Sequence, residues 1–139
     1  MFGTLGVGGG FAAGACAIRP KSEVWIIFGD GSSAYSLNEF DPSVRLGMAP
    51  IAVIGTDASW AQIARDQVTL LGSDVATTLR KTDYQKVAEG YGGVGLLLTD
   101  PTKIDATLDE AKKLAKSGKP VCSNGHIAKT DFREGSISI

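Results

Sequence analysis

Short apolar runs that alternate with longer, more polar stretches constrain the fold of this chain most strongly. Four such runs are too short for helices and are typical of buried strands: residues 23–28 (EVWIIF), 51–54 (IAVI), 94–98 (VGLLL) and 120–123. Strands that alternate with helices favour an α/β fold with a mostly parallel sheet. We therefore expect a three-layer α/β domain.

Glycine content and helical spacing indicate where the helices lie. The segment 6–18 is rich in Gly and Ala and predicts a helix that lies close to a neighbouring backbone or ligand. Further helices are expected over 36–47, from about Trp60, over 84–90 and over 103–117. Asp83 is the expected N-cap of the third of these, and Gly118 and Pro120 end the last. The segment 65–82 has weak periodicity and is expected to be a loop or a short irregular helix.

The composition excludes several classes of function. Lys and Arg number 14 and Asp and Glu 15, so the net charge of −1 does not favour binding to nucleic acid or to an anionic membrane. No apolar run approaches the ~18 residues of a membrane span. One histidine, His126, excludes a multi-histidine metal site, and we expect it to be structural or exposed. The distant Cys16 and Cys122 are expected to be buried free thiols.

Two aspartates directly follow two of the predicted strands. Asp30 lies in Gly-Asp-Gly-Ser after the 23–28 strand, and Asp57 lies just past the 51–54 strand. Neighbouring parallel strands would bring both carboxylates to the carboxyl edge of the sheet, where ligands of open α/β sheets bind. Such carboxylates repel unless a cation lies between them, and Mg²⁺ takes oxygen ligands and substrate phosphates. The pattern suggests a Mg²⁺–diphosphate site, and two unrelated turn aspartates are the alternative.

This arrangement resembles the thiamine diphosphate-binding motif, in which GDG is followed by an Asn pair that closes the next strand. GTLGVGGGFAAGA (3–15) and DYQKVAEGYG (83–92) are similar to segments of the acetolactate synthase superfamily. Three further segments resemble the acetolactate synthase-like 2-hydroxyacyl-CoA lyases of that superfamily: FGDGSSAYSLNEFD (28–41), SWAQI (59–63) and KTDFREGSISI (129–139). The resemblance therefore covers nearly the whole chain and implies the thiamine diphosphate-binding fold.

The resemblance also implies roles for individual residues. Three would ligate Mg²⁺: Asp30 and Asp57 by their side chains and Ser59 by its backbone carbonyl. Four would contact the cofactor itself. Gly31 and Ser32 would bind the diphosphate, Gly3 would accept a bond from the 4′-amino group, and Leu5 would support the bent conformation of the two rings. Asp57, which takes the place of the second Asn, is also counted with the cofactor-binding residues. The Asn pair is Thr56-Asp57 here, which keeps an oxygen ligand at Asp57 and adds a negative charge.

The resemblance implies a longer parent enzyme. In this superfamily the activating Glu belongs to a pyrimidine-binding domain of a second subunit, so no catalytic residue is expected in this chain. Residues 1–139 would then be an N-terminally incomplete diphosphate- and Mg²⁺-binding domain without the pyrimidine-binding and middle domains, inactive by itself. The parent would be an intracellular homo-oligomer, anchored at the endoplasmic reticulum membrane through a segment outside this chain, that acts on acyl substrates.

Two other functions stay open at this point. An acetolactate-forming carboligase acting on 2-keto acids would use the same motifs. A truncated module that binds the cofactor or pairs with full-length subunits would have them without turnover. Trp60 has two interpretations, a core residue or a residue in contact with the cofactor or substrate.

Overall fold

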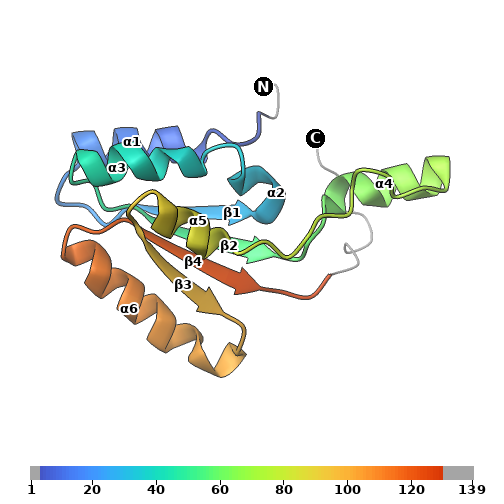
Figure 1. Cartoon of the computed structure of the whole chain (residues 1–139). Coiled ribbons are helices and arrows are strands. Elements are labelled where there is room, and N and C mark those ends of the chain that lie inside the picture. The colour runs from blue at the N-terminus through green and yellow to red at the C-terminus, as the bar shows by residue number, and fades with distance from the viewer. Residues whose placement is uncertain (1–3, 130–139) are drawn as a thin grey trace.

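The computed structural model describes residues 4–129 of the chain, and within them the strands form one parallel sheet. The strands are β1 (Trp25–Gly29), β2 (Ile51–Thr56), β3 (Val94–Leu98) and β4 (Val121–His126), in the order β1-β2-β4-β3. The α/β fold class expected from the sequence is confirmed. Because every pair is parallel, the carboxyl ends of all four strands lie at one edge (Figure 1).

Helices cover both faces of this sheet. The helices in the described residues are α1 (Gly8–Ile18), α2 (Asp30–Ser33), α3 (Phe40–Arg45), α4 (Ala61–Leu71), α5 (Tyr84–Gly90) and α6 (Ile104–Lys116), with short 3₁₀ turns η1 (Leu37–Glu39) and η2 (Pro101–Lys103). Figure 1 shows α1, α3 and α5 on one face and α6 on the other. Among residues 4–129, no helix is both long and apolar enough to cross a membrane.

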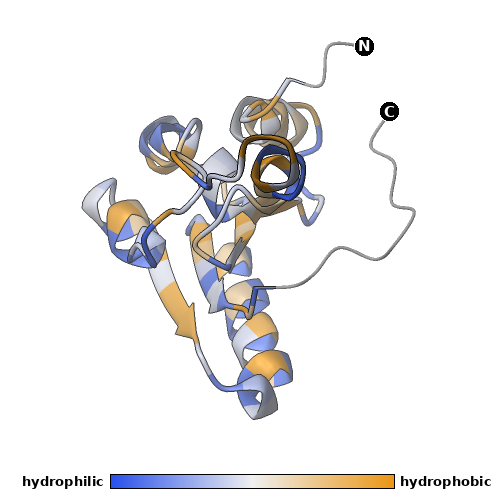
Figure 2. Cartoon of the chain, turned by 90° about the vertical axis from the view of Figure 1, so that its right-hand side faces the viewer, coloured by the Kyte–Doolittle hydropathy of each residue, from blue (hydrophilic) through white to orange (hydrophobic). Residues whose placement is uncertain are grey.

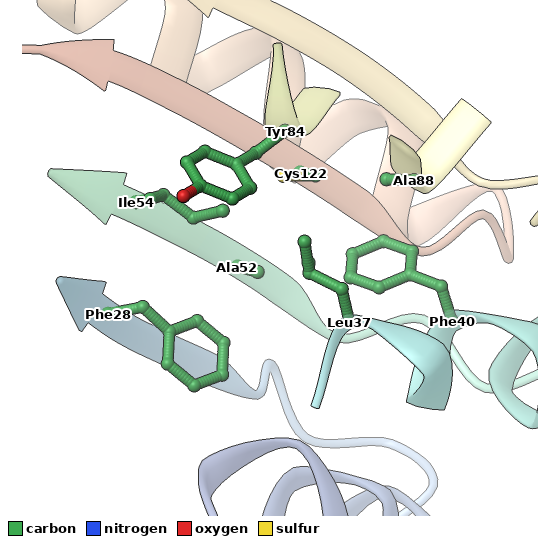
Figure 3. Packing of buried hydrophobic residues seen from close by; sticks show 8 residues of the cluster. All are labelled: Phe28, Leu37, Phe40, Ala52, Ile54, Tyr84, Ala88 and Cys122. Carbon is green, nitrogen blue, oxygen red and sulfur yellow. The ribbon is translucent and has the colours of Figure 1, made fainter. Parts of the chain in front are cut away.

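Each face of the sheet has its own cluster of buried apolar side chains. Between the sheet and α3 and α5 lie Phe28, Leu37, Phe40, Ala52, Ile54, Tyr84, Ala88 and Cys122 (Figure 3). On the opposite face Ile51 and Val121 pack against Ala111 of α6. Figure 2 shows both hydrophilic and hydrophobic residues along α6, as expected for a helix with one apolar face.

Several predicted elements differ from those observed. The helix expected over 36–47 is divided into η1 and α3, and the segment 65–82, expected to be irregular, contains most of α4. The strand expected over 120–123 continues to His126. Asp83 is the N-cap residue of α5, as predicted, but its carboxylate makes no capping bond to the backbone and instead accepts bonds from the side chains of Gln85 and Lys86.

Strand β1 is less buried than its apolar sequence suggests. It forms one end of the sheet within the described residues, and α6 packs on β4, β3 and β2. Ile27, which lies on that face of β1, is therefore 84% exposed.

Helix α4 extends beyond the carboxyl ends of the strands (Figure 1). None of its residues is buried, and Ile63, Leu70 and Leu71 are exposed. The chain returns from α4 to the sheet through residues 72–79, which places a second segment beside the loop that follows β2.

Candidate cofactor and metal site

Asp30 is held at the carboxyl end of β1 by two backbone amides. It is the first residue of α2 and is only 2% exposed. Its Oδ1 accepts a hydrogen bond from the N–H of Gly31 at 2.8 Å, and its Oδ2 accepts one from the N–H of Ala58 at 2.7 Å. The second bond joins the loop after β1 to the loop after β2, so the two loops meet as the sequence predicted. Each carboxylate oxygen still has a lone pair available for a metal ion.

Ala58 adopts a backbone conformation that L-residues rarely take. Its φ is +58°, in the left-handed region, which costs a residue with a Cβ about 1 kcal/mol. This conformation directs its N–H to Asp30, while its carbonyl accepts a bond from the N–H of Leu79 at 2.9 Å. Strain of this kind is typical of functional loops that their surroundings hold in place.

The loop after β2 also contains Ser59, the third predicted metal ligand. Ser59 pairs with Thr78 in an isolated antiparallel bridge, and the residues flanking this pair make its two hydrogen bonds, at 2.8 and 2.9 Å. In such a pair the N–H and C=O of the paired residue itself point away from the partner segment. The Ser59 backbone N–H lowers the pKa of the Asp57 carboxyl, which indicates that the two groups are near each other. The bridge leaves the Ser59 carbonyl unused.

The electrostatics of this edge favour a cation. Burial raises the pKa of the half-buried Asp57, and the negative charge of Asp30 raises it further, against the opposing effects of the Ser59 N–H and Lys129. Asp30 also raises the pKa of Tyr84, although burial contributes more. A divalent cation between Asp30 and Asp57 would replace this repulsion by attraction.

The donor set fits Mg²⁺ bound together with a diphosphate. Among the described residues, no group of three His, Cys, Asp or Glu side chains is gathered to hold a metal ion unaided. Two carboxylates, Asp30 and Asp57, and the Ser59 carbonyl are all oxygen donors, the kind that Mg²⁺ prefers. Because they are few, phosphate oxygens and water would complete the octahedron, which is usual for this ion.

Gly31 and Ser32, the predicted diphosphate-binding residues, lie directly beside Asp30. A Cβ on Gly31 would stand 2.6 Å from the indole of Trp60, so a glycine is required there by close approach. The Gly31 N–H already bonds Asp30, and the Ser32 hydroxyl donates to the Gly29 carbonyl at 2.9 Å. The hydroxyl must rotate to donate to a phosphate, while its oxygen remains a possible acceptor.

Trp60 lies at this site and is not a core residue. It is half-buried, packs on Gly31, and has its ring centroid 6.3 Å from that of the exposed Tyr35. Of the two interpretations of Trp60, the one that places it near a bound cofactor or substrate agrees with its position.

The glycine-rich N-terminal segment packs beside the same loop. Gly6 has a φ of +78°, and a Cβ there would clash with the side chain of Tyr35. The N–H of Gly9 donates to the Ser36 hydroxyl at 3.3 Å. Leu5, the predicted support for the cofactor, is 58% exposed beside Gly6. Gly3 lies outside the described residues.

A buried polar network next to the loop after β2 was not predicted from the sequence. The fully buried Thr56 donates its hydroxyl to Oδ1 of Asn124 at 2.6 Å. The Asn124 amide donates to the Thr82 carbonyl at 3.0 Å and to Oε1 of Gln85 at 2.7 Å. The sequence signal for this network is Asn124 near the end of an apolar strand, because a buried side-chain amide needs hydrogen-bond partners.

The two cysteines and the single histidine are not part of this site. Cys16 and Cys122 are free and buried, as predicted, and burial raises the pKa of Cys122 to about 12, so its thiol stays protonated at neutral pH. His126, expected to be structural or exposed, is the last residue of β4. Its Nε2 is buried and has no hydrogen-bond partner among residues 4–129.

The fold and this edge define a class of protein. A parallel sheet whose neighbouring loops present a glycine-flanked carboxylate and a second carboxylate is typical of an α/β domain that binds a phosphorylated cofactor. The family described as thiamine pyrophosphate enzyme, C-terminal TPP binding domain, matches residues 1–123. This chain belongs to that family.

Relatives agree with this assignment over nearly the whole chain. The chain is 54% identical to a 2-hydroxyacyl-CoA lyase 2 of Danio rerio and 50% identical to that of Homo sapiens, over 99% of its length. It is 35% identical to the acetolactate synthase large subunit IlvG of Mycobacterium tuberculosis over 88% of its length. The chain spans 22% of the length of each of these relatives.

A solved structure shares the fold. The thiamine diphosphate-dependent 4-hydroxybenzoylformate decarboxylase of Rhodococcus jostii RHA1 superposes with a TM-score of 0.75 at 22% sequence identity. The match covers 89% of this chain and 23% of that chain. This similarity confirms the thiamine diphosphate-binding fold.

Proposed function

We propose that this chain is the Mg²⁺-dependent thiamine diphosphate-binding domain of a carbon–carbon lyase acting on 2-hydroxyacyl-CoA-type substrates. The observation that carries the proposal is the bond between the Ala58 N–H and the buried carboxylate of Asp30, which brings Asp30 and Asp57 to one edge. The identity of 54% to a protein named 2-hydroxyacyl-CoA lyase 2 supports the substrate class.

The residues of this chain bind and orient the cofactor. Asp30, Asp57 and the Ser59 carbonyl hold Mg²⁺, and the ion neutralises the diphosphate. Gly31 and Ser32 contact the diphosphate, and Gly3 and Leu5 contact the rest of the cofactor. When bound, thiamine diphosphate supplies a nucleophilic carbon and an electron sink for cleavage beside a 2-hydroxyl group.

Activity requires groups outside this chain. We infer that a pyrimidine-binding domain of a second subunit supplies the activating Glu and that the working enzyme is an oligomer. The relatives are several times longer than this chain, which supports this division of the site. The chain alone should then bind cofactor without turnover.

A complementation assay tests this function. The chain is mixed with the remaining part of a 2-hydroxyacyl-CoA lyase 2, and aldehyde release from a 2-hydroxyacyl-CoA is measured with Mg²⁺ and thiamine diphosphate. We expect release only from the mixture, and none when Asp30→Asn replaces the wild-type chain. Turnover by the chain alone would overturn the division of the site.

The same assay addresses the alternative carboligase. The 35% identity to an acetolactate synthase subunit is the observation that favours this second function. Consumption of a 2-keto acid, with no cleavage of the 2-hydroxyacyl-CoA, would replace the lyase by the carboligase. Cofactor binding without either reaction would leave a non-catalytic binding module as the function.

A further inference from the structure

A continuous chain of hydrogen bonds runs from the buried end of β2 to the surface of α5. It begins at the Thr56 hydroxyl, passes through the amides of Asn124 and Gln85, and reaches the Asp83 carboxylate, which pairs with Lys86. Thr56 and Asn124 are fully buried and Gln85 is 5% exposed. Such a network has few alternative arrangements, because each lost bond would leave a buried polar group without a partner.

The orientation of the Asn124 amide is fixed by its partners. A backbone carbonyl can only accept, so the group that faces the Thr82 carbonyl must be the NH₂ group. The amide oxygen therefore faces the hydroxyl of Thr56, which must donate to it. Asn124 on β4 is paired with Ile54 on β2, and its side chain reaches diagonally between these strands to Thr56, two residues further along β2.

At Thr56, the last residue of β2, this network adjoins residues 57–59, which we call the metal loop. In this loop Asp57 follows Thr56 directly, and Ala58, with its left-handed backbone, donates its N–H to Asp30. The bond from Thr56 to Asn124 holds the residue before this loop to β4. The bond from Asn124 to the Thr82 carbonyl holds β4 to the segment before α5. The bond between Thr56 and Asn124 therefore fixes the end of the strand from which the loop with Asp57 begins.

We propose that Asn124 and Thr56 are positioning residues that set the metal-binding geometry of Asp57 through a buried hydroxyl–amide clamp. This inference rests on the proposed function, because it concerns how the proposed Mg²⁺ ligand is oriented. Asn124 lies just beyond residues 1–123, the part matched by the cofactor-binding family, so the family match itself assigns it no role.

The test compares two variants that each lose one buried hydroxyl. Thr56→Val removes the donor to Asn124 while keeping the shape of the side chain. Ser43→Ala is the matched control, because Ser43 is 1% exposed and its hydroxyl donates to the Glu39 carbonyl at 2.7 Å, away from the metal loop. Affinity for Mn²⁺ is measured by electron paramagnetic resonance at saturating thiamine diphosphate, and stability by urea unfolding.

The positioning role predicts that the two variants differ in metal affinity while both still unfold cooperatively in urea. We expect Thr56→Val to bind Mn²⁺ about 10- to 100-fold more weakly, the range typical of groups that orient metal ligands. Thr56→Ser, which keeps the hydroxyl, should restore the wild-type affinity, and Ser43→Ala should leave it unchanged. Equal Mn²⁺ affinity in Thr56→Val and the wild type would overturn the inference.

A second variant covers the case in which Thr56→Val does not fold. Gln85→Met removes one acceptor of the Asn124 amide from the edge of the network, and a several-fold loss of Mn²⁺ affinity is expected. Unchanged affinity in Gln85→Met would then contradict the positioning role. Absence of Mn²⁺ binding by the wild-type chain would instead contradict the proposed function, so the two failures are distinguishable.

Discussion

At the scale of single residues, Asp57 is where this chain departs from the motif it resembles, and the departure has a cost. Its carboxylate is half-buried and close to that of Asp30, and both effects raise its pKa. We predict that Asp57→Asn is more stable than the wild type in metal-free buffer at neutral pH, by about 0.5–1 kcal/mol. Added Mg²⁺ should stabilise the variant less than the wild type.

Urea unfolding with EDTA and with Mg²⁺ measures both effects. Ser43→Ala serves as a control that changes a buried residue remote from the loop. A metal-free Asp57→Asn variant that is less stable than the wild type would show that the favourable effects of the Ser59 N–H and Lys129 on the Asp57 charge outweigh burial and the charge of Asp30.

The raised pKa of Asp57 also predicts a pH dependence. The folded state binds this proton more tightly than the unfolded state, so the contribution of Asp57 to stability is complete below the ordinary carboxyl pKa. It is lost as the pH rises through the raised value. The advantage of Asp57→Asn should therefore grow with pH across this window in metal-free unfolding curves. An advantage that stays constant with pH would contradict this cause.

The sequence predicted that Asp30 and Asp57 lie at one edge of the sheet, but not the contacts that hold them there. Asp30 and Asp57 were found because each follows an apolar run, and parallel pairing then brings them together. The Asn124 clamp was not found, because a bond between Thr56 and Asn124 depends on the strand order β1-β2-β4-β3. Nothing in the local pattern distinguishes that order from one in which β4 lies elsewhere.

At the scale of elements, close packing between α5 and β3 depends on Gly95. A Cβ there would stand 2.5 Å from the backbone carbonyl of Gln85, so α5 would have to move away from the sheet. We predict that Gly95→Ala destabilises the chain by about 1–3 kcal/mol, as overpacking does. Urea unfolding followed by circular dichroism measures the change.

Gly14 in α1 is the matched control for this substitution. Among residues 4–129, no atom outside the adjacent residues and the surrounding backbone of α1 lies within 4 Å of a Cβ at Gly14. Gly14→Ala should therefore stabilise the helix, by about 0.5–1 kcal/mol. Equal effects of the two substitutions would show that backbone entropy and not packing determines the result.

Helices and strands that depend on nearby residues in the sequence were predicted more accurately than those that depend on packing. The strand over 94–98 and the helices over 84–90 and 103–117 were predicted closely, because periodicity and glycine residues fix them locally. Helix α4 was predicted only at its start, because none of its residues is buried and a core pattern is weak there. The exposure of β1 was not predicted, since a sequence run does not show which strand lies at the end of the sheet.

At the scale of the whole molecule, two loops, after β1 and after β2, form the proposed Mg²⁺–thiamine diphosphate site. Trp60 can report on it, because its indole lies against Gly31. The other tryptophan, Trp25, bonds Glu23 at the opposite end of β1 and can be replaced by Phe to remove its emission.

The most direct test is a titration of the Trp25→Phe chain with thiamine diphosphate, followed by Trp60 fluorescence, with Mg²⁺ and with EDTA. We expect a saturable change in Trp60 emission with Mg²⁺. Thiamine diphosphate should bind at least about ten-fold more weakly in EDTA, or when the chain also carries Asp30→Asn. Equal affinity with and without Mg²⁺, or equal affinity with Asp30→Asn, would contradict the proposed metal site.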